Sequence, residues 1–334
     1  NKSGTPYAMT EDEARDAANA VMCAGLLHDI GNPPFGHFGE VVIGDWFKSH
    51  LDRLSYKGRP LSQWLDRQMK ADLCHFEGNA QALRLLTKVY RVDSAFGMDL
   101  MPAVLNTLVK YPVDSTRVDK ASADVKLHKL GYYKAEEALF GALASATGTR
   151  TVEGFCRHPL TYILEAADDI AYATADLEDA YKKGLFTLDE FERFFRDTLE
   201  AKKDDWGLNG GQVKKSAEMI DELTRLRERE SSSMAAFQRW IAYARHWLMY
   251  TAAFGFVPYG AGQTDSYSAI MEGTFRREIM EGTFHGGSIR ILKAAMGRFA
   301  YDSEGILTLE LAAQTILTTL LSRFVPAVLY LDAG

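Results

Sequence analysis

The chain has 334 residues, of which 47% are hydrophobic and 25% are charged, and these are ordinary values for a soluble globular protein. Its formal net charge of −7 excludes a generally basic, nucleic-acid-binding surface, so a polyanionic substrate would need a local basic pocket. The cysteines are odd in number and form no C-x-x-C pair, which favours reduced thiols in the cytosol over a disulfide framework: they are Cys23, Cys74 and Cys156.

No apolar stretch is long enough to predict a membrane helix. The most apolar tract, 306–331, is interrupted by Glu310, Gln314 and Arg323, so it falls short of the roughly 18 uninterrupted apolar residues that a span requires. The sequence begins with Asn1 rather than Met, as expected of an interior segment of a longer protein, and an upstream targeting signal stays open. We expect a cytoplasmic protein with no membrane partner.

Helical patterns dominate the chain, and the alternation typical of strands is scarce. Thr10 and Glu13 form a capping-box pattern, which predicts a helix running from there to the His28-Asp29 pair, where Gly31 ends it. Apolar residues at helical spacing predict further helices over 41–51, 78–90, 101–110, 159–183, 188–199, 213–231, 235–254 and 307–330. We expect one mostly α-helical domain over 1–334, with a catalytic core over about 10–185 and a helical C-terminal extension over about 186–334.

The segment 28–40, His-Asp-Ile-Gly-Asn-Pro-Pro-Phe-Gly-His-Phe-Gly-Glu, concentrates reactive side chains in a constrained backbone. Neutral imidazole and carboxylate together suit a divalent transition metal, which makes His28 and Asp29 candidate ligands. Adjacent helical side chains diverge by about 100°, so both reach one ion only at a helix end, where this pair lies. A capping or surface pair is the alternative, but the surrounding glycines, prolines and second histidine favour a metal site.

A second carboxylate is expected from the segment 165–176. Asp168, Tyr172 and Asp176 are spaced i, i+4 and i+8, so they share one helix face. Alanines between them keep the helix slim, which lets a ligand approach. An ordinary solvated acidic face is the alternative interpretation, and this segment alone does not decide between the two.

Four segments together resemble the HD-domain deoxynucleoside triphosphate triphosphohydrolase family, and within it the bacterial dGTPase branch. They are His28–Glu40, Phe76-Glu-Gly-Asn-Ala-Gln81, Lys110-Tyr-Pro112, and Glu165-Ala-Ala-Asp-Asp-Ile-Ala-Tyr172 continuing to Asp176. They span about the first half of the chain in the family's order, and little resemblance is evident beyond Lys183. The resemblance implies an all-α, HD-type helical fold with additional C-terminal helices.

The resemblance also implies a metal-dependent hydrolysis of dNTPs, with dGTP favoured, to a deoxynucleoside and inorganic triphosphate. The implied metal ligands are His28, Asp29 and Asp168, with Mn or Mg expected and Co, Ni or Zn as alternatives. The family has one further ligand, a histidine on a preceding helix, but no histidine precedes His28 here. Either the visible chain begins after that histidine or the protein departs from the family, and the missing Met favours the first explanation.

Chemistry and resemblance together give His37 the role of general acid, because the leaving 5′-oxygen needs a proton. Glu40, three residues on, would orient His37 or tune its pKa. A loop histidine that bonds to backbone is the alternative for His37.

The remaining expected site residues bind the substrate. Tyr172 resembles the family residue that packs on the deoxyribose and leaves no room for a 2′-hydroxyl, with plain core packing as its alternative. Asp176 would accept a hydrogen bond from the 3′-hydroxyl. The triphosphate needs donors, and we expect them to be Lys110, Tyr111, Asn79 and Lys129, although a lone lysine is more often a solvated surface residue.

The resemblance further implies homo-oligomers, often hexamers, and a response of some members to dNTP or single-stranded DNA as effector. One competing interpretation is another HD-domain phosphohydrolase, a phosphodiesterase or nucleotidase, which has no use for the sugar-binding face. The other is a catalytically inactive nucleotide- or ssDNA-binding module, for which 214–215 and 225–229 are the basic clusters. Glutamates interspersed near these clusters favour an ordinary solvated helix.

Overall fold

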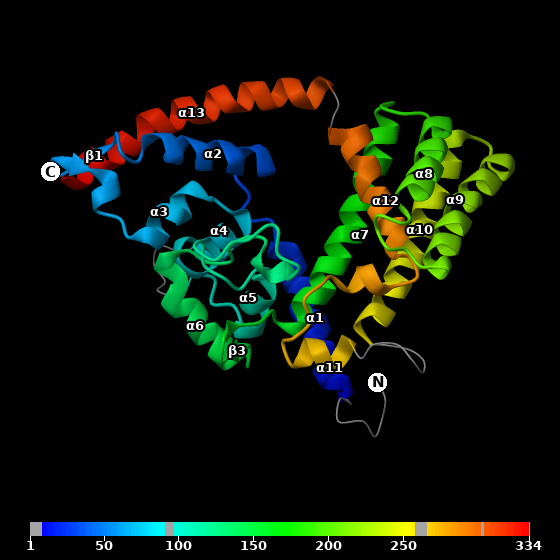
Figure 1. Cartoon of the computed structure of the whole chain (residues 1–334), viewed down its shortest axis with the longest axis horizontal. Helices are drawn as coiled ribbons and strands as arrows, with labels where there is room; N and C mark the ends of the chain where they lie inside the picture. Colours follow the sequence, from blue (N-terminus) through cyan, green and yellow to red (C-terminus); the bar gives the residue numbers. More distant parts are fainter. Residues whose placement is uncertain (1–8, 91–96, 258–265, 302–303, 334) are drawn as a thin grey trace. The chain divides into compact units, whose positions relative to one another are not determined.

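The structure is a computed structural model that describes residues 9–90, 97–257, 266–301 and 304–333. Helices make up most of the described chain, and the strands form only two short antiparallel hairpins (Figure 1). The prediction of an all-α fold is therefore confirmed. The chain groups into two compact units, unit 1 with residues 1–164 and 309–334 and unit 2 with residues 165–308. This grouping does not test the prediction of one domain over 1–334 with a catalytic core over about 10–185, which stays a prediction.

Unit 1 is built from helices around a main apolar cluster and smaller ones. Its helices are α1 (Glu11–Leu27), α2 (Gly36–His50), α3 (Arg67–Cys74), α4 (Gly78–Arg84) with a π-helical turn (Leu85–Val89), α5 (Pro102–Leu108) and α6 (Glu137–Ala146). Three 3-10 turns (Leu61–Gln63, Val125–Leu127 and Lys134–Glu136) and two hairpins connect them: β1 (Ser55–Tyr56) with β2 (Arg59–Pro60), and β3 (Arg150–Thr151) with β4 (Gly154–Phe155).

The helix that ends at the candidate metal pair is fixed by the main cluster. Ala24, on the last turns of α1, is fully buried and packs with Leu83 of α4 and Leu105 and Leu108 of α5. Thr10 and Glu13 form the predicted capping box, and α1 ends at Leu27 with the next residue as its C-cap. The two ends of α1 are thus set by the cap and by packing, which gives its C-terminus a defined position.

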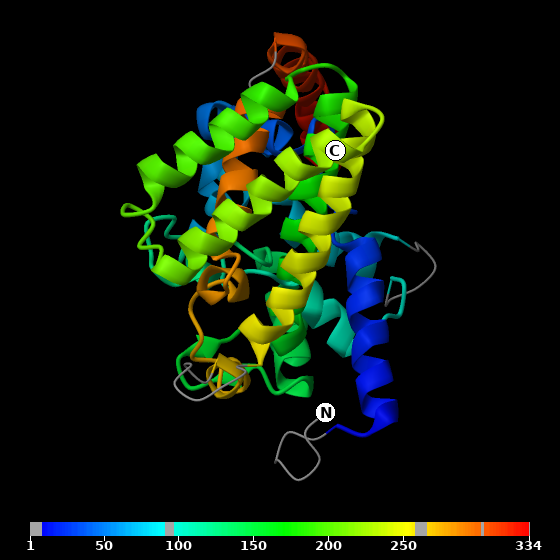
Figure 2. The same ribbon diagram turned by 90° about the vertical axis from the view of Figure 1, so that its right-hand side faces the viewer.

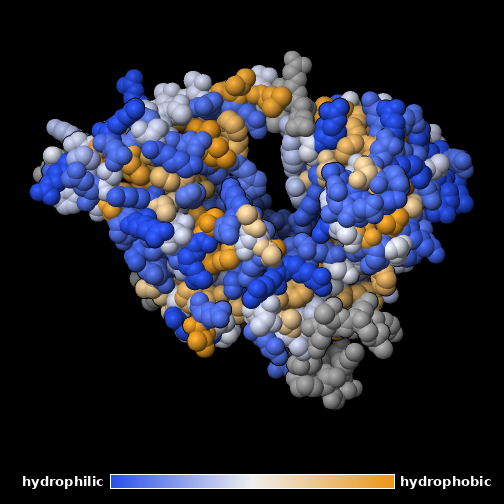
Figure 3. All heavy atoms as spheres, in the orientation of Figure 1, coloured by the Kyte–Doolittle hydropathy of each residue, from blue (hydrophilic) through white to orange (hydrophobic). Residues whose placement is uncertain are grey.

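The last helix of the chain, α13 (Glu304–Ala333), packs part of its length on α2. Trp46 Nε1 donates to Ser322 Oγ at 3.0 Å, and Leu321, Val325 and Leu329 pack on the small cluster around Trp46. Many apolar side chains elsewhere on this helix are exposed, and Figure 3 shows apolar atoms over part of it. By length and composition Leu307–Leu331 could cross a membrane, which by itself is weak evidence, and the expected absence of a membrane partner stays a prediction.

Unit 2 is a helical bundle with an aromatic core. It contains most of α7 (Pro159–Lys182), then α8 (Leu188–Lys202), α9 (Gly210–Arg229), α10 (Ser233–Phe256), α11 (Ser266–Met271), a 3-10 turn (Ile279–Gly282), and α12 (Gly286–Met296) with a π-helical turn (Gly297–Tyr301). The long helices α8, α9 and α10 pack together (Figure 2). Phe191, Phe237 and Trp240 are fully buried between them, and Trp240 Nε1 donates to the carbonyl of Met219.

The structure corrects one predicted boundary that bears on the site. The helix predicted over 41–51 begins at Gly36, so His37 and Glu40 lie on the first turn of α2 rather than in a loop. Its N-cap, Phe35, has a φ of 67°, a left-handed conformation that is uncommon for a large side chain. The left-handed Phe35 lets the helix begin directly after Pro33 and Pro34. The periodicity of apolar residues did not reveal this early start.

Candidate active site

His28 and Asp29 lie together at the C-terminal end of α1, as the sequence predicts. His28 Nδ1 lies 2.7 Å from the carbonyl oxygen of Gly25, so this nitrogen donates, and Nε2 faces Asp29 Oδ2 at 3.3 Å. The second oxygen of Asp29 accepts from Asn32 Nδ2 at 2.9 Å. A histidine that gives one ring N–H to a backbone carbonyl and turns its other nitrogen beside a carboxylate oxygen is typical of metal ligands. The donor set therefore fits a divalent metal.

Two glycines bring α4 against the loop that carries the candidate metal ligands. A Cβ on Gly31 would lie 2.0 Å from the carbonyl oxygen of Gly78, and a Cβ on Gly78 would lie 2.3 Å from Asn32 Oδ1. No side chain fits at either contact. The close approach lets the Gly78 N–H donate to Glu40 Oε1 at 2.7 Å, which links α4 to α2.

His37 and Glu40 form a hydrogen-bonded pair. His37 Nδ1 lies 2.9 Å from Glu40 Oε2, and the His37 side chain is 78% exposed while that of Glu40 is 9% exposed. The hydrogen bond to Glu40 raises the pKa of His37. Burial opposes ionisation of Glu40, but the hydrogen bonds from His37 and Gly78 outweigh it and lower the pKa of Glu40. The arrangement favours an exposed imidazole that carries a proton, as a general acid requires.

A second buried carboxylate, Glu77, lies beside this pair and was not predicted from the sequence. Its Oε1 accepts from Lys129 Nζ at 3.0 Å and from Asn79 Nδ2 at 2.8 Å. Lys129 Nζ is also 4.0 Å from Glu40 Oε2. Burial raises the pKa of Glu77 despite the neighbouring ammonium. The predicted substrate residues Asn79 and Lys129 are thus brought together with Glu40, around a carboxylate that holds both.

Lys110 and Tyr111 lie on a segment next to the one that carries Lys129. The Gly131 N–H donates to the carbonyl of Val113 at 3.0 Å, which joins the two segments. Arg157, only 2% exposed, donates from Nε to the carbonyl of Lys110 at 2.6 Å and lies over the Tyr111 ring at 5.4 Å. Lys110 is itself buried. Arg157 therefore holds the backbone of Lys110 and lies over the ring of Tyr111, a role that no sequence pattern indicated.

The remaining predicted site residues, Asp168, Tyr172 and Asp176, lie on the part of α7 that belongs to unit 2. Asp168 and Asp176 are partly buried, and Tyr172 is 37% exposed, so this face differs from the core face that carries Ile170, Ala173 and Leu177. Tyr172 thus lies on a partly exposed face of α7, and its role stays a prediction. Burial and the neighbouring Asp169, Asp176 and Asp168 raise the pKa of Tyr172.

Two further contacts define the chemistry of this helix. Tyr301 donates from its hydroxyl to Asp176 Oδ2 at 2.7 Å, and Lys293 Nζ lies 2.6 Å from Asp169 Oδ1. Asp169 is thus committed to an ion pair within unit 2. Within the described ranges, no three histidine, cysteine, aspartate or glutamate side chains gather into a set that could hold a metal ion.

Comparison with known proteins shows what the chain that carries this site is similar to. The HD domain model matches residues 7–89, which include His28, Asp29, His37, Glu40 and Asn79. A protein from Listeria monocytogenes named "deoxyguanosinetriphosphate triphosphohydrolase-like protein" is 38% identical over 97% of this chain. The chain thus contains a match to the HD domain and is similar over most of its length to a protein named as triphosphohydrolase-like. The expected HD-type fold and the family resemblance are confirmed.

Two further relatives extend the similarity. A "probable deoxyguanosinetriphosphate triphosphohydrolase" from Pseudomonas aeruginosa is 35% identical over 92% of the chain, and a "deoxyguanosinetriphosphate triphosphohydrolase" from Enterobacter sp. (strain 638) is 32% identical over 92%. The chain spans 65% of the Listeria protein, 60% of the Pseudomonas protein and 61% of the Enterobacter protein. The similarity thus covers the second half of the chain, where the sequence motifs gave little, while the roles of individual site residues stay predictions.

Proposed function

We propose that this protein hydrolyses deoxynucleoside triphosphates, dGTP foremost, to a deoxynucleoside and inorganic triphosphate. The observation that carries the proposal is the His37–Glu40 pair, a proton-bearing imidazole at the start of the helix that follows the His28–Asp29 loop. The names of the relatives from Pseudomonas and Enterobacter support the same reaction and base.

The proposed reaction depends on a divalent metal held by His28, Asp29 and Asp168. The contact of His28 Nε2 with Asp29 Oδ2 and the support from Gly25 and Asn32 are the observations in favour. When bound, the ion would polarise a phosphoryl oxygen and make a coordinated water a better nucleophile. Mn or Mg is the expected ion, with Co, Ni or Zn as alternatives that the donor set also accepts.

His37 supplies the proton that the leaving group needs. Water adds to the α-phosphorus and releases a proton to solvent, the bond from that phosphorus to the 5′-oxygen breaks, and a proton passes from His37 to the departing oxygen. His37 is left neutral and regains its proton from solvent before the next turnover. Because Nδ1 is bonded to Glu40, Nε2 is the nitrogen that delivers the proton. Glu40 stabilises the charged imidazole before the transfer and keeps its ring oriented, which is how a neighbouring carboxylate assists a general acid.

The substrate's charge and sugar are bound by separate groups of residues. Lys110, Tyr111, Asn79 and Lys129 are proposed to contact the triphosphate, and their support from Arg157 and Glu77 keeps them in place. On α7, Tyr172 would pack on the deoxyribose and Asp176 would accept from the 3′-hydroxyl. An acceptor placed to bond a sugar hydroxyl discriminates against sugars that lack its partner.

The assembly and location of the protein are also proposals. The family resemblance implies a homo-oligomer, often a hexamer. The exposed apolar side chains of α13 support an oligomer, because large apolar surfaces are typical of interfaces. A cytoplasmic location and a dNTP or ssDNA effector follow from the resemblance.

The reaction is tested by its products. The protein is incubated with Mn²⁺ and each dNTP in turn, and the phosphate products are separated. The proposal requires inorganic triphosphate, with the fastest release from dGTP. Pyrophosphate or orthophosphate instead would identify another HD-domain phosphohydrolase, and no product in the presence of bound metal would indicate an inactive binding module.

A further inference from the structure

The face of α7 that carries the proposed sugar-binding residues is contacted by a tyrosine that follows α12. Tyr301 donates from its hydroxyl to Asp176 Oδ2 at 2.7 Å, although 125 positions separate the two residues in sequence. Both residues belong to unit 2. Because Tyr172 lies one helical turn before Asp176, the proposed sugar-packing ring and the proposed 3′-hydroxyl acceptor share the face that Tyr301 contacts.

Core packing fixes the position from which Tyr301 reaches α7. Tyr301 is the last residue of the π-helical turn that continues α12. Two residues earlier, the Phe299 ring packs against Phe186 and Phe194, with centroid distances of 4.7 and 5.3 Å. Helical turns of the π type are rare and occur frequently at functional sites. The turn that presents Tyr301 to Asp176 is therefore a candidate for a functional element.

The hydrogen bond is not the main link between α12 and α7. Lys293 Nζ already lies 2.6 Å from Asp169 Oδ1, about two helical turns before Asp176, where the two helices run side by side (Figure 1). Leu292, on the core-facing side of α12, is fully buried. Tyr301, in contrast, is 42% exposed, and a hydrogen bond open to water contributes only modestly to stability, because water can replace either partner. A role other than joining the helices explains this contact better.

The contact leaves one oxygen of the Asp176 carboxylate for a ligand. Tyr301 occupies Oδ2, and among the residues that the structure describes no protein group donates to Oδ1. A carboxylate has about four acceptor positions on its two oxygens, so it can accept from a tyrosine and from a sugar hydroxyl at once. Asp176 is only partly buried, so without Tyr301 its side chain would be free to exchange rotamers. The tyrosine therefore keeps Oδ1 in one orientation.

The chemistry of the tyrosine sets the direction of this hydrogen bond. Burial and the hydrogen bond to Asp176 raise the pKa of Tyr301, and the neighbouring Tyr172 adds to the rise. The Tyr301 hydroxyl thus keeps its proton at physiological pH and donates it to the carboxylate. An ionised carboxylate only accepts hydrogen bonds, so the oxygen that remains is suited to a second donor such as a sugar hydroxyl.

We propose that Tyr301 is a positioning residue for the sugar: it holds the Asp176 carboxylate so that Oδ1 receives the 3′-hydroxyl of a deoxyribose that lies on Tyr172. The inference rests on the proposed function, in which Asp176 and Tyr172 bind the sugar. It adds the end of α12 to the site, so two elements of unit 2 share the recognition of the sugar. Tyr301 acts through Asp176 and does not contact the reacting atoms.

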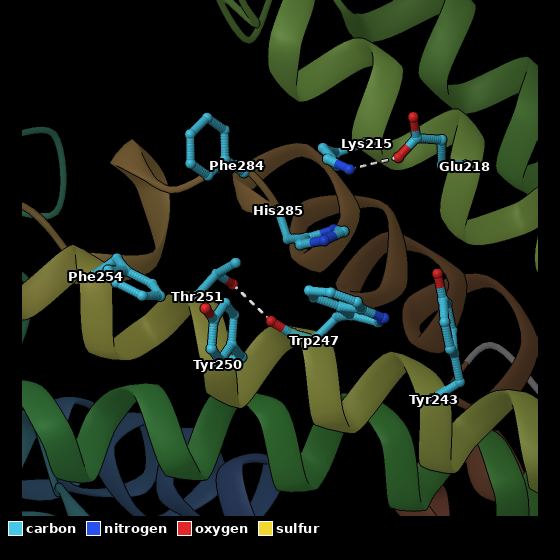
Figure 4. A pocket seen from close by; sticks show the side chains of 9 residues that line it. All are labelled: Lys215, Glu218, Tyr243, Trp247, Tyr250, Thr251, Phe254, Phe284 and His285. Atoms are coloured by element: carbon cyan, nitrogen blue, oxygen red, sulfur yellow. Dashed lines mark hydrogen bonds and ion pairs between the residues drawn. The ribbon is translucent and has the colours of Figure 1, made fainter. Parts of the chain in front are cut away.

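The test compares the binding of deoxyguanosine and 2′,3′-dideoxyguanosine, measured by equilibrium dialysis in the presence of Mn²⁺. The two nucleosides differ only in the 3′-hydroxyl, and neither contains a phosphate bond that the protein could hydrolyse. The variants are Tyr301→Phe, which keeps the ring and loses the hydroxyl, Asp176→Ala, and the double variant. Tyr250→Phe is the matched control, because Tyr250 is an exposed tyrosine of unit 2 on the wall of a pocket of about 570 Å³ to which α7 contributes no residue (Figure 4).

We expect the parent protein to bind deoxyguanosine about tenfold or more tightly than the dideoxy compound, as for one hydrogen bond to a charged group. Tyr301→Phe should reduce this preference about threefold or more by weakening the binding of deoxyguanosine alone, because the freed carboxylate must be ordered when the sugar binds. Tyr250→Phe should keep the parent's preference. The double variant should show the same preference as Asp176→Ala, because Tyr301 acts only through Asp176.

Three results would overturn the inference. The first is a Tyr301→Phe variant that keeps the parent's preference or binds both nucleosides equally less well, as a general loss of structure would cause. The second is tighter binding of deoxyguanosine by Tyr301→Phe, because the tyrosine would then compete with the sugar for Asp176. The third is a parent protein that does not distinguish the two nucleosides.

Release of triphosphate from dGTP is measured separately in the parent protein. Its absence, with the preference for deoxyguanosine intact and dependent on Tyr301, would count against the proposed reaction alone. Normal release of triphosphate, with a preference that Tyr301→Phe leaves unchanged, would count against the positioning role alone.

Discussion

Glu40 hydrogen-bonds through both of its oxygens, with Oε2 2.9 Å from His37 Nδ1 and Oε1 2.7 Å from the backbone nitrogen of Gly78. One carboxylate therefore orients the candidate acid and also anchors the start of α4 beside the loop that carries the candidate metal ligands. Its position depends on the absence of a side chain at Gly78, where a Cβ would lie 3.0 Å from Glu40 Oε1. The candidate acid and the loop are thus positioned by the same buried group.

Replacing His37 with alanine should lower kcat by about 10²–10⁴-fold, the range that a general acid contributes. Metal affinity should be unchanged, because His37 contacts Glu40 rather than the His28–Asp29 pair. Steady-state kinetics and metal binding at equilibrium check both points. His75→Ala, an exposed histidine bonded only to backbone, is the control. Normal turnover in His37→Ala would rule out the acid role.

The pH profile of Glu40→Gln tests how the acid is tuned. The hydrogen bond to Glu40 raises the pKa of His37, so the proton-bearing form persists below that raised pKa and is lost as the pH rises through it. Glutamine removes the carboxylate, so the alkaline decline of kcat should move to lower pH. Glu137→Gln, which removes an exposed partner of Lys134, should leave the profile in place. An unchanged alkaline decline in Glu40→Gln would show that another group titrates.

Lys129 and Glu77 allow substrate binding to be separated from stability. Lys129→Met removes a cation that lowers the pKa of the buried Glu77, so it should lower the Tm at neutral pH and raise KM about tenfold, the equivalent of one lost charge-assisted hydrogen bond. The double variant Glu77→Gln/Lys129→Met removes the buried charge as well. This double variant should regain the Tm of the parent protein, while its KM should stay as high as in Lys129→Met.

The effect of Glu77→Gln on the Tm should increase as the pH rises. Burial raises the pKa of Glu77 above its ordinary value, so its ionisation opposes folding as the pH rises through that pKa. Thermal unfolding of Glu77→Gln should therefore show a higher Tm than the parent at neutral pH and no difference in acid, where the carboxyl is already protonated. A gain that persists in acid would mean that the substitution acts through packing. Recovery of KM in the double variant would remove Lys129 from the triphosphate site.

Tyr172→Ala should admit ribonucleotides. The ring is proposed to occupy the space of a 2′-hydroxyl, so its removal should reduce the ratio of kcat/KM for dGTP over GTP by tenfold or more, as expected when a pocket loses a steric contact. Discrimination between dGTP and its 3′-deoxy analogue depends on Asp176 instead and should be retained. Competition assays with the three nucleotides measure both ratios. A variant that still refuses GTP would contradict the sugar-packing role.

Local sequence patterns predicted the elements whose signals are local. The capping box at Thr10 and Glu13 and the long apolar periodicity of α7 and α10 gave helices close to those observed. The helices that the sequence did not predict are short or lack a clear pattern of apolar residues at helical spacing. They are α3, α6, α11 and α12. The early start of α2 was missed because Phe35 adopts a left-handed conformation that apolar spacing does not encode.

The candidate site was predictable where its residues are adjacent in sequence. His28 with Asp29, and His37 with Glu40, are neighbours or one helical turn apart, so spacing and chemistry sufficed. Contacts between distant segments did not follow from any pattern: these are Glu77 with Lys129, Arg157 with Lys110, and Tyr301 with Asp176. Tertiary packing alone decides which lysine meets which buried carboxylate, and a single sequence carries no record of it.

The central claim is that water attacks the α-phosphorus of dGTP while His37 protonates the departing 5′-oxygen. Its most direct test is turnover in ¹⁸O-labelled water, with mass analysis of both products. We expect one labelled oxygen in inorganic triphosphate and none in deoxyguanosine. Label in the deoxyguanosine, or formation of pyrophosphate with dGMP, would contradict it.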